Sequence, residues 1–164
     1  MTYHVKDLEA GPLLDQAVLR ALGATHEQEC PENVPDHVRE RWPAEGAMVL
    51  TDDDGNQMFY GMRNIPQFST EWGVGGPVLF DKARISILSD GPGWAADVDS
   101  IGLAKAYVYD DDDEDLPSET CPVSALVAAC RAMVLANVGA ETIELVDPFA
   151  TKFGTASAVQ GPPR

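Results

Sequence analysis

The sequence predicts an α+β fold in a single layered domain, with a mainly antiparallel sheet packed against two long helices and one short helix. Amphipathic helical segments lie near both ends, and short β-prone runs separated by turns rich in Gly, Asp and Pro lie between them. A chain of 164 residues, 45% of them hydrophobic, can bury a core of ordinary size. We expect residues 1–150 to form the domain and residues 151–164, which are small, polar and proline-rich, to form a flexible tail.

The first predicted helix spans residues 11–23. Pro12 suits its first turn, and Gly23 suits a left-handed stop. One face is apolar at helical spacing: Leu14, Ala17, Val18, Ala21 and Leu22. Asp15, Gln16 and Arg20 lie away from that face.

The second predicted helix spans residues 120–139, from "TCPV" to a closing Gly139. Its apolar stripe consists of Val123, Leu126, Val127, Cys130, Met133 and Val134. Cys130 is therefore expected to be buried, and Arg131, which lies off the stripe, is expected to be accessible.

The middle of the chain predicts strands. Residues 47–62 contain two β-prone runs around "DDDG", which is typical of a hairpin. The runs "ISILS", "WAADV", "LAKAYVY" and "TIELV" predict four more strands. Residues 24–46 contain three prolines and little periodicity, so we expect at most one helical turn there, in "DHVRERW".

Charge and cysteine content restrict the classes of function. With 27 acidic and 11 basic residues the formal net charge is −16, which repels nucleic acid and anionic membranes. We therefore expect no direct nucleic-acid partner and no membrane. Three cysteines, no signal peptide and no apolar run of membrane-spanning length indicate free thiols in the cytosol.

The candidate metal-binding and catalytic residues do not have the spacing that such sites require. The acidic runs at residues 52–54 and 110–115 lack the EF-hand pattern, and the latter is expected to be a solvated loop. His26, Cys30 and His37 do not match the spacing of a zinc site. No histidine or cysteine belongs to a recognisable catalytic motif. We expect no metal, no cofactor and no enzymatic activity.

The stretch "FSTEWGVGGP", residues 68–77, has two interpretations. In one, the glycines allow close approach to a ligand, and Pro77 begins a short helix whose free N–H groups hold an anion. Basic residues near this stretch, Arg63 among them, would then complete an anion pocket. In the other, the stretch is a tight turn that seats Trp72 in the core, and the bases are ordinary surface charges.

Several segments in the same order resemble the NinX-like family of small phage proteins: "GPLLDQAVLRALG", "FSTEW", "GGPVLFDKARISI", "GWAA" and "PVSALVAACRAMVLANVG". The resemblance covers roughly residues 7–23, 68–96 and 120–147. The hairpin region 43–63 and the long acidic run depart from the family pattern. A related phage α/β sandwich domain family shares the first and last helices and is a competing assignment. The resemblance implies a phage protein that acts in the host cytoplasm, and it brings no known reaction.

We expect a non-enzymatic protein that binds a small nucleotide-derived ligand. By analogy with other small phage proteins, it would sequester a host immune signal, such as a cyclic ADP-ribose-like molecule or a cyclic dinucleotide, as an anti-defence sponge. The candidate ligand-binding residues are Ser69, Thr70, Trp72, Gly75, Gly76, Lys82 and Arg84. Trp72 would stack on a base, the hydroxyls would donate hydrogen bonds, and the glycine backbone and the two bases would meet phosphate.

Two alternatives stay open. The acidic surface, above all residues 110–115, could engage a basic host protein or mimic DNA. A homo-oligomer with a pocket at a two-fold interface is also compatible with the sequence.

Overall fold

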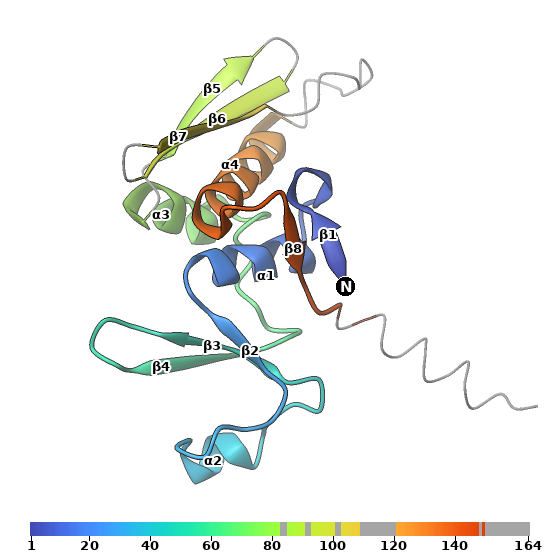
Figure 1. Ribbon diagram of the computed structural model, residues 1–164, viewed down its shortest axis with the longest axis vertical. Coiled ribbons are helices and arrows are strands. Elements are labelled where there is room, and N and C mark those ends of the chain that lie inside the picture. The colour runs from blue at the N-terminus through green and yellow to red at the C-terminus, as the bar shows by residue number, and fades with distance from the viewer. Residues whose placement is uncertain (83–84, 91–92, 101–102, 109–120, 148, 150–164) are drawn as a thin grey trace, which may run out of the picture.

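The computed structural model describes residues 1–82, 85–90, 93–100, 103–108, 121–147 and 149, and its helices and antiparallel strands confirm the predicted α+β class (Figure 1). The strands are β1 (Thr2–His4), β2 (Thr25–Glu27), β3 (Ala47–Thr51), β4 (Gln57–Gly61), β5 (Ile85–Asp90), β6 (Gly93–Ser100), β7 (Leu103–Val108) and β8 (Thr142–Glu144). The helices are the 3₁₀ helix η1 (Val5–Asp7), α1 (Pro12–Ala21), α2 (Asp36–Arg39), α3 (Trp72–Lys82) and α4 (Cys121–Val138). The acidic run 110–115, Arg84 and the predicted tail 151–164 lie outside the described residues.

The strands divide into three small antiparallel sheets, whereas the sequence predicted one. β1 pairs with β8, β2 and β4 flank β3, and β5, β6 and β7 form a meander. The predicted hairpin and the four later strands are confirmed. The strands β1 and β2 have three residues each, and they add to sheets that the sequence pattern did not reveal.

Helix α4 contacts several other elements of the fold. It packs against β6 and β7 on one side and against α1 on the other, so it lies between the meander and α1 in Figure 1, and α3 contacts both α4 and β5. All residues from 125 to 134 are buried, including every described member of the predicted stripe. The expected exposure of Arg131 is wrong. Its side chain is only 6% exposed, and its Nε donates a hydrogen bond of 2.6 Å to the carbonyl oxygen of Leu8.

Helix α1 has the predicted bounds within two residues, and Gly23 after it has the predicted left-handed backbone, with φ of 100°. Asp15 and Gln16 lie away from the predicted apolar face, yet both are buried. The Gln16 side chain donates to the carbonyl oxygen of Val146 and accepts from the Val146 N–H, both at 2.8 Å. These bonds satisfy the buried amide and tie α1 to the chain that follows β8.

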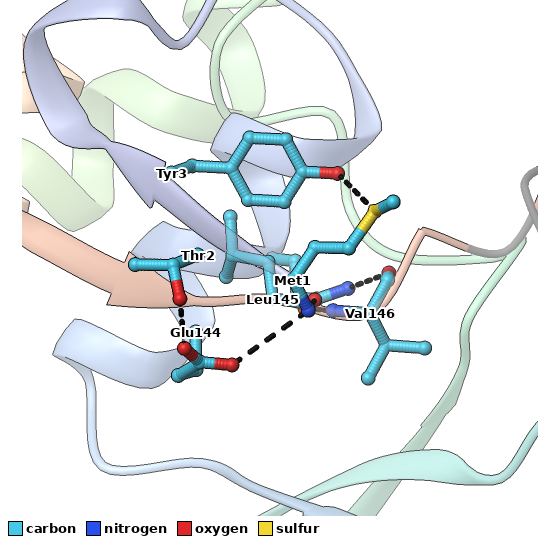
Figure 2. A network of polar contacts seen from close by, with 7 residues as sticks. Met1, Thr2, Tyr3, Glu144, Leu145 and Val146 are labelled. Carbon is cyan, nitrogen blue, oxygen red and sulfur yellow. Dashed lines mark hydrogen bonds and ion pairs between the residues drawn. The ribbon is translucent and has the colours of Figure 1, made fainter.

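The pairing of β1 with β8 joins two distant parts of the sequence, as Figure 2 shows. The amino group of Met1 donates to the carbonyl oxygen of Leu145 at 3.0 Å and lies 3.6 Å from the Glu144 carboxylate. The Thr2 hydroxyl donates to that same carboxylate. None of the helices in the described ranges is long and apolar enough to cross a bilayer.

The hairpin of β3 and β4 has two different faces. Leu50 pairs with Met58, and Met48 pairs with Tyr60, so these four side chains share one face of the sheet. Residues at the alternate positions, Phe59 among them, share the other face. Each face borders its own cleft.

Candidate functional site

The predicted start of the third helix at Pro77 is wrong. Helix α3 begins at Trp72, and Pro77 is an interior residue. The N–H groups of Val74 and Gly75 both donate to the carbonyl oxygen of Glu71, at 3.0 and 2.8 Å. These amides are therefore already used within the chain, and no free helix start is available at Pro77 to hold an anion.

Ser69 lies in a buried joint between α1 and α3. Its Oγ accepts a hydrogen bond of 2.9 Å from the Gly11 N–H, and its own N–H donates to Asp15 Oδ1 at 2.7 Å. Ser69 and Asp15 are both buried. Burial raises the pKa of the Asp15 carboxyl, and its hydrogen bonds with Ser69 partly oppose that rise. The structure thus gives the Ser69 hydroxyl a structural role and no ligand-facing surface.

The close backbone approach predicted for the glycines exists, but its partner is the protein itself. A Cβ atom added to Gly75 would collide with the carbonyl oxygen of Phe68 and lie 3.2 Å from a methyl group of Leu126. Gly76 is buried beside the ring of Trp72, which is itself half-buried and packed against the core. Gly75 therefore lets α3 approach the 68–70 turn and α4.

The remaining predicted residues do not meet at one place. Thr70 lines a cleft of about 370 Å³ together with Asp15, Arg63 and Gln67. Lys82 lines a different cleft, and Arg84 lies outside the described residues. The described members of the predicted set are therefore divided between a buried joint and two separate surfaces.

A third cleft, of about 380 Å³, lies between the α2 region and one face of the β3–β4 hairpin, and we call it the α2 cleft. Its lining residues are His37, Val38, Arg41, Trp42, Pro43, Ala47, Phe59, Gly61 and Asn64. Among them are two aromatic side chains, an arginine, a histidine and an amide, and none is a carboxylate. The lining thus differs in charge from a chain whose net charge is −16.

The aromatic pair in the α2 cleft has a defined geometry. Trp42 and Phe59 meet edge to face, with ring centroids 5.9 Å apart and planes at 74°. The indole N–H of Trp42 donates to the carbonyl oxygen of Gln28 at 3.3 Å. Both rings are only half-buried, so part of their aromatic surface borders the cleft.

The loop that carries Trp42 is attached to β2. His26 Nε2 lies 3.0 Å from the carbonyl oxygen of Glu45, and the Gln28 amide donates to the carbonyl oxygen of Ala44 at 2.8 Å. With the Trp42 bond, three contacts hold this loop against His26 in β2 and against Gln28, the residue that follows this strand, and β2 is itself paired with β3. The wall of the α2 cleft is therefore supported by a sheet.

Sequence reasoning missed the α2 cleft. Residues 24–46 contain little periodicity, whereas the glycine-rich stretch at 68–77 has a pattern typical of an anion site. A signal was present in "DHVRERW", where His37, Arg39 and Arg41 precede a tryptophan in a chain with few bases. The contribution of Phe59 depends on strand register, which that signal does not contain.

Comparison with known proteins finds no matching family model, curated protein or solved structure. The resemblance to the NinX-like family therefore stays a prediction. Within the described ranges, no group of three or more His, Cys, Asp and Glu side chains could hold a metal ion.

Proposed function

We propose that this protein binds a small nucleotide-type ligand without transforming it, and that the ligand occupies the α2 cleft. The observation that carries the proposal is the lining of this cleft: two aromatic rings, Arg41 and His37, with no carboxylate, in a chain with 27 acidic residues. The proposal keeps the ligand class expected from the sequence and moves the site away from residues 68–77.

Electrostatics favour an anion at this place. In a protein of net charge −16, an anionic group meets the least repulsion where bases line the surface and acids do not. Arg41 is exposed and makes no ion pair with any described residue. Its guanidinium can therefore pair with a phosphate without first leaving a carboxylate.

The aromatic pair supplies the second part of the recognition. A nucleobase can stack on the open surface of Trp42 or Phe59, an interaction worth about 1–3 kcal/mol per base. Asn64 offers an amide that can both donate to and accept from a base edge. A volume of about 380 Å³ lies within the range of small-molecule sites.

The biological role that we propose is sequestration of a host immune signal of the cyclic ADP-ribose-like or cyclic-dinucleotide class. It is supported by the resemblance to small phage proteins and by the aromatic and basic lining of the α2 cleft. A binding protein of this kind would act in the host cytoplasm by lowering the free concentration of the signal.

Native mass spectrometry with a panel of adenine and guanine nucleotide signals tests the proposal. We expect a mass shift equal to the intact ligand, and an affinity about tenfold weaker for Arg41→Gln, because a charge-assisted hydrogen bond is lost. Arg39→Gln is the matched control, since it removes the same charge from the same segment but does not line the cleft.

Three outcomes would contradict the proposal. Product masses would show an enzyme, and equal weakening by the two arginine variants would show attraction to overall charge. If the folded protein showed no mass shift with any nucleotide in the panel, a nucleotide site would be ruled out.

A further inference from the structure

The cleft that Lys82 lines lies on the opposite face of the β3–β4 hairpin, and we call it the hairpin groove. It encloses about 470 Å³ between α1, the hairpin, the 66–68 segment and α3. Its walls are mostly apolar, with Leu19 from α1, Leu50 and Met58 from the hairpin, and Val74 and Val78 from α3. The groove is therefore larger and more apolar than the α2 cleft.

The alternation of side chains along β4 keeps the two clefts separate. Met58 and Tyr60 line the hairpin groove, whereas Phe59 and Gly61 line the α2 cleft. The Tyr60 hydroxyl lies 3.6 Å from the Met58 sulfur, as expected for side chains on one face of the strand. An occupant of the groove would thus contact different residues from the ligand of the α2 cleft.

The groove exposes apolar surface at its mouth. Met58 is 42% exposed, although it is a large hydrophobic residue in a paired strand. Methionine side chains are flexible and polarizable, and they are common on surfaces that adapt to apolar partners. This exposure indicates that the groove can accept an apolar side chain from outside.

The rim on the hairpin side is acidic. The Asp52 carboxylate accepts hydrogen bonds from the N–H groups of Asp54 and Asn56 and from the Asn56 amide, which together lower its pKa. Asp53 also lines the groove, and its carboxylate makes no hydrogen bond or ion pair among the described residues. Among the described residues, the hairpin side of the groove therefore has an unpaired carboxylate beside an apolar wall, and the one base in the lining, Lys82, belongs to α3.

We propose that the hairpin groove docks a short peptide segment of a partner protein, in which a bulky apolar side chain is followed or preceded by Lys or Arg. The apolar side chain would lie against Met58, Val74 and Val78, and the basic group would pair with Asp53. Complementary charge identifies the partner: a basic segment is attracted by a protein of net charge −16 and by the acidic turn. A second copy of this chain has the same negative charge and would be repelled.

Selection from a display library of random peptides, about 12 residues long, tests this proposal on the full-length protein. We expect the enriched peptides to combine a bulky apolar residue with Lys or Arg. Fluorescence anisotropy of an enriched peptide should show binding about tenfold weaker for Asp53→Asn, because a charge-assisted bond is lost. Met58→Gln, which removes the apolar surface at similar volume, should also weaken it.

Asp54→Asn is the matched control, because it removes the same charge from the same turn but does not line the groove. It should bind the peptide almost as well as the unmodified protein, and so should Arg41→Gln, whose side chain lies in the other cleft. Equal urea midpoints for all the variants would show that folding is unchanged.

Other results would overturn the proposal. The selection could enrich no peptide, or it could enrich peptides that lack Lys and Arg. Asp53→Asn and Asp54→Asn could also weaken peptide binding equally. Sedimentation showing a dimer that Met58→Gln converts to monomer would make the groove an interface between copies of this chain.

Discussion

A substitution at Gly75 tests the close packing of α3 against Phe68 and Leu126. Its position allows α3 to lie against the carbonyl oxygen of Phe68, where an added Cβ would collide with backbone and lie 3.2 Å from Leu126. A backbone carbonyl cannot turn away as a flexible side chain can, so Gly75→Ala must displace either the helix or the 68–70 turn. Overpacking of this kind costs about 1–3 kcal/mol.

The same substitution two residues earlier should have the opposite sign. A Cβ at Gly73 would have no atom within 4 Å, and Gly73 lies in the same helix. Gly73→Ala should therefore stabilise the protein by about 0.5 kcal/mol through reduced freedom of the unfolded chain. The pair separates a steric effect from a change in helix propensity.

Urea denaturation followed by far-UV circular dichroism measures both variants. With a slope of about 2 kcal/mol per molar urea, a loss of about 2 kcal/mol lowers the midpoint by about 1 M. If Gly75→Ala were as stable as the unmodified protein, or if both variants moved in the same direction, the close contact between α3 and Phe68 would be refuted.

Two further predictions concern the buried polar residues of α1. Gln16→Leu should lower the free energy of unfolding by about 2 kcal/mol, because the backbone of Val146 loses both of its hydrogen bonds to the Gln16 side chain. Thermal unfolding measures this loss, and an unchanged melting temperature would contradict the prediction. The pKa of Asp15 is higher in the folded state than in the unfolded state, so folding favours the protonated carboxyl. The contribution of Asp15 to the free energy of unfolding is therefore fully present below the unfolded-state pKa and is lost as the pH rises through the folded-state pKa. The stability of Asp15→Asn relative to the unmodified protein should therefore increase from pH 4 to pH 7, and a constant difference in urea unfolding across that range would contradict the assignment.

The elements with strong periodicity were predictable from sequence. Helices α1 and α4 are long enough for their apolar spacing to exceed chance, and the hairpin has an explicit turn. Strands β1 and β2, with three residues each, are too short to show alternation. Helix α3 was misplaced because Gly-Pro is typical of a helix start, whereas here the turn at 67–71 begins the helix earlier.

The candidate site was less predictable, because it depends on contacts between distant residues. The Ser69 hydroxyl meets the Gly11 N–H across 58 positions of sequence, and nothing near Ser69 indicates that partner. The α2 cleft combines Trp42 with Phe59 through the register of β2, β3 and β4. Composition identified the scarcity of bases, but only the fold shows that Arg41 and His37 line a cleft together with Trp42 and Phe59.

The links between the start and the end of the described chain also bear on when the protein can fold. Val5 bonds to Glu141, Leu8 accepts from Arg131, and Gln16 bonds to Val146, while β1 pairs with β8. Contacts between residues so far apart in sequence require closure of a long loop, which slows folding. During translation, the first sixteen residues leave the ribosome early but must wait for residues 131–146 before they reach their final partners. They are therefore synthesised well before their partners, and until those partners emerge the apolar face of α1 is open to aggregation.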